Sequence, residues 1–320
     1  MTALSLTWVP DDGSFVPNQA SPTRLPRLNN TSMINASFAS FSHGPELSAY
    51  EFACLDSFAK HGSDVVLYSY GGIANLPKGV VAKDAAAILP GTELNAFSIK
   101  GVPSMAHFTD YFRFVMFQKT GEIWTDTDVL LLRPFRLGTT GNIIGKESAS
   151  SICTALLRLD PDDRRLATLI ERVEAMKGAQ IEWGETGPRL LTAVYRVDAG
   201  MPENVFYPVH FDDYYKVLLP QYFDECAALC AGSTALHLWN NRLVGMGLFK
   251  RIGPPHGSFL HYLFEKTGAN DLFSDFYPIG VMQTMINNVE QKVGRDEGLR
   301  KLARIALPVI KSAVLRRLNI

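Results

Sequence analysis

From Met33 onward, segments typical of strands alternate with segments typical of helices. Apolar runs of strand length cover 34–41, 64–70, 122–132, 152–159 and 234–239. Helical spacing of apolar residues, or a helix start signal, separates them at 46–61, 105–119, 161–177 and from Thr186. Such alternation predicts an α/β fold with a mostly parallel central sheet flanked by helices. In such sheets, ligands bind at the carboxyl ends of the strands.

The composition allows a sizeable core and excludes several classes of protein. The chain has 320 residues, of which 47% are hydrophobic and 20% charged, which excludes a disordered protein. The net charge of −1 excludes the basic footprint of a general nucleic-acid binder. The four cysteines lack the spacing of a zinc site or a disulfide framework, so we expect reduced core thiols in a cytoplasmic protein. We see no signal peptide, and no apolar run reaches the roughly 18 residues of a membrane-spanning helix.

The two ends of the chain differ from the middle. Residues 1–30 contain four prolines and few periodic apolar positions, so we expect an extended arm before a catalytic domain at 31–283. Residues 284–320 are expected to form a basic amphipathic helical tail. Its last part, 299–320, has six Lys or Arg and no acid. Such a helix can lie on an anionic membrane surface, and docking on the domain is the alternative.

Asp126 and Asp128 are the strongest chemical signal in the sequence. They stand two residues apart between the apolar segments EIW and VLLL. In an extended chain, residues i and i+2 point to the same side, so the two carboxylates should project together. Paired carboxylates suit a hard divalent cation, Mg²⁺ or Mn²⁺, which also binds phosphate oxygens. We therefore expect a site for the diphosphate of a sugar nucleotide.

The preceding helix supports this interpretation. Segment 105–119 is apolar nearly all round, and Asp110 and Arg113 share one of its faces. Charged residues on a buried helix are uncommon unless they are paired or line a site. Trp124 is expected on the same side of the strand as Asp126, where it could stack on a base or a sugar. An internal ion pair and a core tryptophan are the alternative interpretations.

The pattern D-x-x-R, then apolar residues, then G-x-x-x-x-D-x-D resembles glycosyltransferase family 32, a DXD-containing sugar-transferase group. That group includes bacterial capsule and lipopolysaccharide glycosyltransferases, α-1,4-galactosyltransferases and initiating α-1,6-mannosyltransferases. The resemblance covers about 33–270, with further matching stretches at 41–70, 76–90, 186–192 and 235–240. The residues of the core pattern are Asp110, Arg113, Gly121, Trp124, Asp126 and Asp128.

The resemblance implies a GT-A-type nucleotide-sugar-binding fold and transfer of a hexose with retention at the anomeric carbon. It implies that Asp128 binds the metal and that Asp126 contacts ribose, sugar or metal. Asp110 and Arg113 would hold hydroxyls of the donor sugar. Because no carboxylate in the sequence stands out as a nucleophile, we favour front-face substitution with the leaving phosphate as the base.

The resemblance also implies roles for residues outside the core pattern. His237 and Asn240 would close the metal–diphosphate site, and Gly187-Pro188 would shape the acceptor side. Ser42, His43 and Tyr70 would form the nucleoside pocket. Many members of the group have Gly-Gly where this chain has Thr120-Gly121, and a Trp where it has Phe41-Ser42-His43-Gly44. Taken alone, His237 in its apolar strand also fits a buried core histidine.

Together these features predict a metal-dependent retaining glycosyltransferase with Mn²⁺ or Mg²⁺ as the cofactor. We expect a UDP-hexose donor in preference to GDP-mannose, and a glycan or glycolipid acceptor in surface-polysaccharide synthesis. The expected location is the cytoplasm, at the inner face of the cytoplasmic membrane. The alternatives are a catalytically relict sugar- or nucleotide-binding protein, a haloacid-dehalogenase-like phosphohydrolase, whose motif also begins D-x-D-V, and a toxin that acts on protein hydroxyls.

Overall fold

The computed structural model describes residues 36–136, 138 and 140–292. The chain divides into two units, Met1–Ile34 and Asn35–Ile320, and every described residue lies in the second unit. The predicted arm at 1–30 and the basic segment 299–320 lie outside the described residues. The predicted domain bounds therefore stay predictions.

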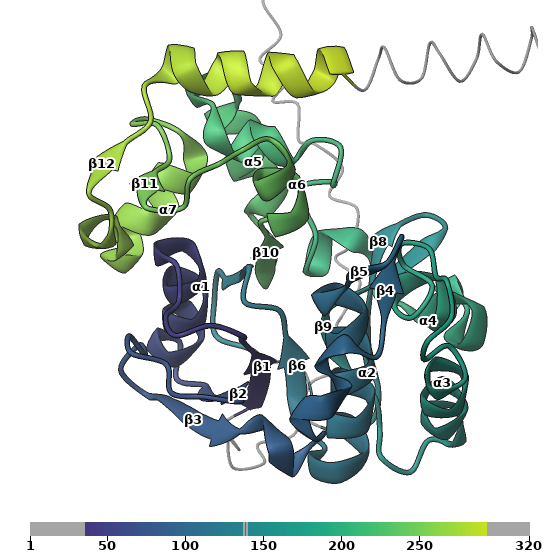
Figure 1. The fold of residues 1–320 in the computed structure, drawn as a ribbon. Coiled ribbons are helices and arrows are strands. Elements are labelled where there is room, and N and C mark those ends of the chain that lie inside the picture. Colours follow the sequence, from purple (N-terminus) through teal and green to yellow (C-terminus); the bar gives the residue numbers. More distant parts are fainter. Residues whose placement is uncertain (1–35, 137, 139, 293–320) are drawn as a thin grey trace, which may run out of the picture. The chain divides into compact units, whose positions relative to one another are not determined.

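The centre of the fold is a six-stranded sheet with the order β3-β2-β1-β6-β9-β8 (Figure 1). Four neighbouring strands are parallel: β3 (Val80–Asp84), β2 (Asp64–Ser69), β1 (Ser37–Phe41) and β6 (Ile123–Thr125). The remaining two are antiparallel to their neighbours: β9 (Ser151–Arg158) and β8 (Ile143–Ser148). The predicted α/β fold with a mostly parallel central sheet flanked by helices is confirmed.

The prediction of one strand over 122–132 is wrong. Strand β6 ends at Thr125, and β7 (Val129–Leu131) pairs with β10 (Ala235–His237) in a separate antiparallel sheet. Between β6 and β7 the backbone N–H of Val129 donates to the carbonyl of Asp126 at 3.3 Å. Aspartate side chains favour turns over ladders, so the polar interruption ends one strand instead of sitting within it.

Helices cover both faces of the sheet (Figure 1). The four longest α-helices with both ends described are α1 (Ala49–Lys60), α2 (Met105–Thr120), α3 (Arg164–Glu174) and α7 (Phe259–Thr267). Helix α1 begins with a capping box between Ser48 and Glu51, which satisfies two backbone N–H groups. Helix α2 ends at Gly121, whose φ of 67° is the left-handed conformation that glycine adopts at low cost.

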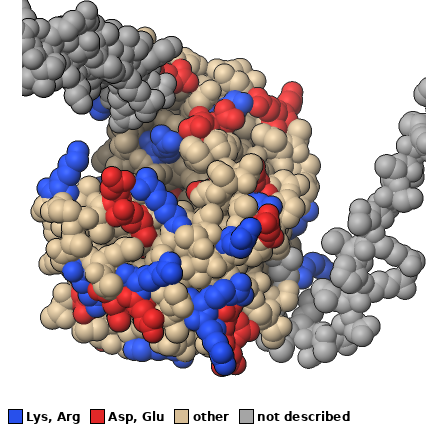
Figure 2. Space-filling view, turned by 90° about the vertical axis from the view of Figure 1, so that its right-hand side faces the viewer, with Lys and Arg blue, Asp and Glu red and all other residues tan. Residues whose placement is uncertain are grey.

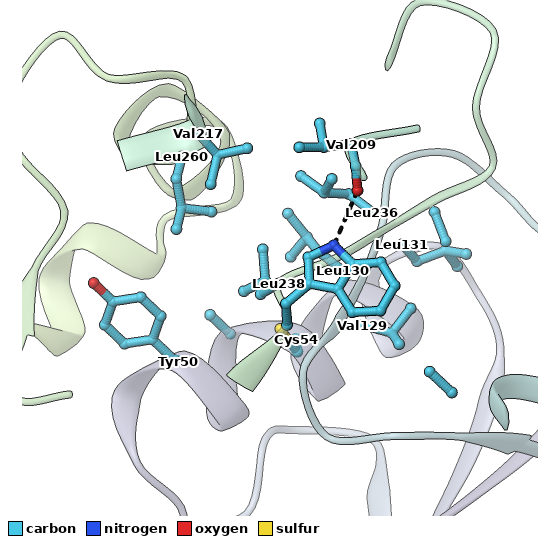
Figure 3. Close-up of a cluster of buried hydrophobic side chains, with 14 of the residues drawn as sticks. Tyr50, Cys54, Val129, Leu130, Leu131, Val209, Val217, Leu236, Leu238 and Leu260 are labelled. Carbon is cyan, nitrogen blue, oxygen red and sulfur yellow. Dashed lines mark hydrogen bonds between the residues drawn. The ribbon is translucent and has the colours of Figure 1, made fainter. Parts of the chain in front are cut away.

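Alternate residues of the central strands belong to two buried clusters. Phe38 of β1 and Leu67 of β2 lie in the first cluster with α1, and Ala39 and Tyr68 lie in the second with α2. This alternation follows from the two-residue repeat of a strand, and it buries both faces of the sheet. Figure 3 shows part of the first cluster, where Tyr50 and Cys54 of α1 meet side chains from β7, from the β10 region and from α7.

Shorter elements complete the described chain. Two two-stranded pairs are β4 (Ser98–Ile99) with β5 (Val102–Pro103), antiparallel, and β11 (Ile252–Gly253) with β12 (Asp275–Phe276), parallel. The short helices are α4 (Pro188–Tyr195), α5 (Phe223–Cys230) and α6 (Asn240–Gly245). A further helix runs from 279 to the last described residue, 292, and buries Met282 and Ile286 in the first cluster. The described start of the predicted tail is therefore docked on the domain.

Among the described residues, no helix is long and apolar enough to cross a membrane. On the face shown in Figure 2, basic and acidic side chains are interspersed. A mixed surface of this kind on the visible face agrees with the near-zero net charge.

Helix α3 begins later than the sequence predicts, and its cap supports a stability prediction. The predicted range 161–177 would make Asp160 the residue before the helix, but Asp163 is the N-cap, and its carboxylate accepts from the backbone N–H of Arg165 at 3.0 Å. We expect Asp163→Ala to lower the free energy of unfolding by about 1 kcal/mol at pH 7, measured by urea denaturation. Asp162→Ala, at the exposed neighbouring position, is the control, and an equal loss in both variants would contradict the cap.

The stabilisation by Asp163 should depend on pH. Hydrogen bonds from the Arg165 side chain hold the pKa of Asp163 well below its usual range. Partial burial acts in the opposite direction, and a hydrogen bond from Asn142 lowers the pKa further. A lowered pKa means that the folded state gains from the ionised carboxylate above the ordinary Asp pKa of about 4. The difference between wild type and Asp163→Ala should therefore shrink as the pH falls below that value. A difference that stays constant down to acid pH would contradict this assignment.

Candidate functional site

A cavity of about 630 Å³ opens at the carboxyl ends of β1 and β6. Ser42 and His43, which follow β1, line it, as do residues of α2, the β6–β7 turn, β9 and the start of α6. A cavity at the carboxyl edge of a mostly parallel sheet is the expected place for a ligand. The structure brings nine of the ten predicted site residues to this cavity: Ser42, His43, Asp110, Arg113, Trp124, Asp126, Asp128, His237 and Asn240.

Asp126 is held at the end of β6. Its backbone N–H donates to the carbonyl of Ala155 on β9 at 2.7 Å. Its carboxylate accepts from the indole N–H of Trp124 at 2.6 Å and lies 3.2 Å from the guanidinium of Arg113. These contacts fix one carboxylate oxygen toward the protein. The predicted convergence of the two aspartates does occur, but on a turn and not on an extended strand.

Asp128 is held by the end of β10 and the start of α6. Its Oδ2 lies 3.1 Å from Nε2 of His237 and accepts from the backbone N–H of Asn240 at 2.7 Å. Trp239 adopts a left-handed conformation with φ 54° between β10 and α6. This rare conformation for a bulky residue turns the chain sharply just before Asn240, which donates its N–H to Asp128. The indole N–H of Trp239 donates to the carbonyl of Val209 at 2.9 Å.

Asp126, Asp128 and His237 can hold a metal ion. One ligand atom from each lies within 4.8 Å of the others. Within the described part of the chain, Nδ1 of His237 and Oδ1 of Asn240 are buried without a hydrogen-bond partner. Buried polar atoms without partners are rare and call for a water or an ion. Two carboxylates with an imidazole fit Mn²⁺ well and Mg²⁺ through the carboxylates.

The two carboxylates have different acidities. Burial raises the pKa of Asp126 to about 6, against the lowering effect of Arg113, and the charge of Asp128 adds to the rise. Burial also acts to raise the pKa of Asp128, but the charge and hydrogen bond of His237 and the N–H of Asn240 outweigh it and hold this pKa below the usual value. In the absence of a cation, the site thus favours ionised Asp128 and a readily protonated Asp126.

Arg113 is buried and contacts five residues. Its guanidinium lies 3.5 Å from Asp110 and 3.2 Å from Asp126, and it donates to the carbonyls of Thr154 and Thr109. Its planar head lies over the ring of Trp124, 4.7 Å from the centroid. The internal ion pair proposed as an alternative is therefore present, and both members of the pair also line the cavity.

Asp110 is fixed by the segment before α4. Thr186 donates its hydroxyl to Asp110 at 2.9 Å. A Cβ at Gly187 would lie 2.4 Å from Oδ2 of Asp110, so this position must be glycine for the segment to approach. Burial raises the pKa of Asp110, and Arg113 and Thr186 only partly offset the rise. Gly187 thus packs directly against the predicted donor-sugar residue.

Trp124 and Tyr70, predicted to stack on a ligand or to contact the nucleoside, are held by contacts within the protein. Trp124 is 1% exposed and packs against Phe112, so its position fits the alternative of a core tryptophan, with its N–H directed at Asp126. Tyr70 is absent from the described residues that line the cavity, and its hydroxyl donates to the carbonyl of Leu89 at 2.8 Å. The contact of Trp124 with Asp126 agrees with the shared side of the strand that periodicity predicts, whereas the contact of Tyr70 with Leu89, 19 residues away, could not be predicted from it.

Sequence reasoning missed several residues of the cavity. Glu147 of β8, Thr154 and Ala155 of β9, and Trp183 before α4 all line it. Trp183 precedes the T-G-P stretch by three residues, which was the available signal. No sequence signal indicated Glu147, because the antiparallel pairing of β8 with β9 brings it to the site.

The chain is similar to curated glycosyltransferases over less than half of its length. Lactosylceramide 4-alpha-galactosyltransferase of Rattus norvegicus is 28% identical over 155 residues, which cover 44% of this chain and 42% of that protein. The Homo sapiens protein of the same name is 26% identical over 152 residues, which cover 43% and 42%. The predicted resemblance to glycosyltransferases is confirmed. The match spans about two fifths of the length of these relatives, and no family model matches the chain.

Two solved structures are distantly similar to this chain. The "PaToxG Glycosyltransferase" structure has a TM-score of 0.37 and 11% identity, covering 52% of this chain and 70% of its own. The "WbbM bifunctional glycosytransferase apo structure" has a TM-score of 0.43 and 11% identity, covering 77% and 52%.

Proposed function

We propose that this protein is a metal-dependent glycosyltransferase that moves a hexose from a nucleotide-sugar to a glycan or glycolipid acceptor. The observation that carries the proposal is the convergence of Asp126, Asp128 and His237 in one cavity with the buried Asp110–Arg113 pair. The curated galactosyltransferase relatives support sugar transfer as the reaction.

In this proposal, different residues of the cavity bind different parts of the donor. Asp126, Asp128 and His237 would hold Mn²⁺ or Mg²⁺, which when bound neutralises charge on a diphosphate. Ser42 and His43 contact the nucleoside. Arg113 is fully paired in the structure, so it acts by fixing Asp110 and Asp126 and by adding fixed positive charge beside the cavity.

Asp110 is the group that we place against the donor sugar. Its carboxyl lines the cavity, and Thr186 and Gly187 fix its direction. A carboxyl held in this way can bind one or two sugar hydroxyls without reorganising. We propose retention at the anomeric carbon by front-face substitution, with a UDP-hexose as the donor.

The acceptor and the cellular role are proposed from the name of the relatives and from the basic segment 299–320. The curated relatives are named as lactosylceramide galactosyltransferases, so a lactosyl glycolipid is the first acceptor to test. We place the enzyme in surface-polysaccharide synthesis at the cytoplasmic membrane, with 299–320 as the segment that would contact lipid. Deletion of 299–320 that leaves membrane fractionation unchanged would contradict the lipid contact.

Metal removal should abolish nucleotide binding. We expect calorimetric titration of UDP with Mn²⁺ to show binding at least about tenfold tighter than titration with EDTA, because a cation held by Asp126, Asp128 and His237 would offset the charge of the diphosphate and contribute more than about 1.4 kcal/mol. GDP in the same titration tests the choice of donor. Binding of either nucleotide that ignores the metal would contradict the proposed site.

Turnover separates the enzyme from a relict binding protein. Release of UDP from UDP-galactose or UDP-glucose with Mn²⁺, with lactosylceramide or water as the acceptor, would support the enzyme. Metal-dependent UDP binding without release of UDP from either donor would favour a relict site.

A further inference from the structure

Trp183 is an exposed tryptophan at the edge of the cavity. It is 55% exposed, whereas Trp124 and Trp239, which also line the cavity, are 1% and 6% exposed. Met105, 37% exposed, lines the same part of the wall. Large aromatic side chains usually bury their surface, and an indole left open at the rim of a cavity is available to contact a ligand there.

The indole of Trp183 is held in place although it is exposed. Its ring meets that of His107 edge to face, with centroids 6.0 Å apart and planes at 88°. His107 is itself 1% exposed and fixed at both nitrogens, by the hydroxyl of Ser104 at 2.6 Å and the carbonyl of Glu182 at 3.0 Å. A rigid aromatic surface loses little conformational entropy when a ligand binds to it.

The segment that carries Trp183 also fixes the predicted donor-sugar residue. Thr186 donates to Asp110, and Gly187 packs against the same carboxyl. The backbone N–H of Arg189 donates to the carbonyl of Gly184 at 3.0 Å, which closes the segment into a tight turn. Trp183 thus lies three and four residues before Thr186 and Gly187, which contact Asp110, and Trp183 and Asp110 line the same cavity.

Trp183 and the predicted nucleoside residues are positioned by different strands of the sheet, β9 and β1, which are separated by β6. Ser42 and His43 follow β1, next to α1, and Trp183 precedes α4, which packs against β9 (Figure 1). A nucleotide-sugar that runs from Ser42 to Asp110 would present its sugar toward Trp183. The molecule that meets the indole should therefore be the one that receives the sugar.

We propose that Trp183 is the platform on which a pyranose ring of the acceptor glycan stacks. The C–H face of a pyranose carries slight positive charge and packs on the negative face of an indole. Glu182 and Arg189 form an exposed ion pair at 3.0 Å beside the indole, and their polar atoms can bind hydroxyls at the ring edge. This inference rests on the proposed function for the identity of the ligand as an acceptor.

The test compares Trp183→Ala with Trp183→Phe and with Phe249→Ala. Phe249 is 58% exposed and lies outside the residues that line the cavity, so it controls for loss of a surface aromatic. Each protein is titrated with UDP and Mn²⁺, and each is applied to an array of lactosyl, mannosyl and glucosyl oligosaccharides with and without UDP. Thermal unfolding checks that the variants are folded.

We expect wild type to bind at least one of these glycans and Trp183→Ala to bind it about tenfold more weakly, with Trp183→Phe in between and Phe249→Ala unchanged. The affinity for UDP should be the same in all four proteins. Glycan binding that is equal in wild type and Trp183→Ala would overturn the proposal, as would a wild type that binds none of the glycans. Loss of UDP affinity in Trp183→Ala would assign the indole to the base instead.

The UDP titration tests the proposed function, and the glycan array tests this inference separately. If wild type fails to bind UDP with Mn²⁺, the proposed donor site is wrong, and the array without UDP still decides whether Trp183 binds a sugar. If UDP binds but the array shows no dependence on Trp183, the donor site stands and the platform does not.

Discussion

Asp128→Asn is expected to lower kcat/KM for release of UDP from the donor by about 10³-fold, the size of effect seen when one preorganised electrostatic group is removed from an active site. The amide keeps the shape of the side chain and can still accept from the backbone N–H of Asn240. What it loses is the negative charge that faces His237 and that completes the proposed cation site. The fold should therefore survive while the chemistry does not.

Kinetics at saturating Mn²⁺ and the thermal midpoint of each variant check this expectation. Asp212→Asn is the matched control, because Asp212 is exposed, is paired with Arg242 and lies outside the residues that line the cavity. Asp128→Asn with the turnover of wild type would remove the basis of the metal-dependent proposal. An equal loss in Asp212→Asn would show that the effect is one of general surface charge.

Arg113→Met should lower the free energy of unfolding by about 3–5 kcal/mol, because it removes one partner from a buried network and leaves the others behind. Arg113 and Asp110 have side chains that are 4% and 9% exposed, so little of the lost contact surface is open to water. Asp126 loses the same partner, and the carbonyls of Thr109 and Thr154 lose their donors. Urea denaturation measures the difference.

The loss in Arg113→Met should grow as the pH rises. Burial raises the pKa of Asp110 and of Asp126, and the positive charge of Arg113 lowers both. Without Arg113 the folded pKa values rise further above the unfolded ones, so the folded state gains from protonation at low pH and loses that gain as the pH rises. The deficit against wild type should thus be larger at pH 8 than at pH 5.5.

Arg251→Met provides the control for loss of an arginine. Arg251 pairs with Glu46 at 3.0 Å with both side chains exposed, so its removal should cost about 0–1 kcal/mol. A similar loss in both variants, or a deficit in Arg113→Met that does not change with pH, would contradict the buried network as its origin.

Local pattern was enough to predict the central elements and part of the site. The apolar runs at 34–41, 64–70 and 152–159 became β1, β2 and β9, and the apolar helix 105–119 became α2. Asp110 and Arg113 meet because residues three apart share a helix face. Asp126 and Asp128 converge because they are neighbours along the chain, although the turn between them was not predicted.

Local pattern failed where a neighbour far along the chain decided the structure. Segment 122–132 reads as one strand, yet β7 leaves the central sheet because β10 pairs with it. Tyr70 directly follows β2, as predicted, but its hydroxyl donates to the carbonyl of Leu89. The start of α3 moved from Asp160 to Asp163, since either aspartate can cap a helix and Asn142 and Arg165 bind the second one.

The sequence by itself determined the α/β architecture, the paired charges of α2 and the acidic turn, because each depends on residues within a few positions of one another. Only the tertiary structure decided that Asp128 meets His237 and Asn240, which lie 109 and 112 residues further along the chain. The antiparallel register of β10 with β7 sets His237 opposite Val129, next to Asp128. Likewise, the packing of Gly187 against Asp110 brings Trp183 to the cavity. Strand register and close packing arise between distant segments, so neither is written in local periodicity.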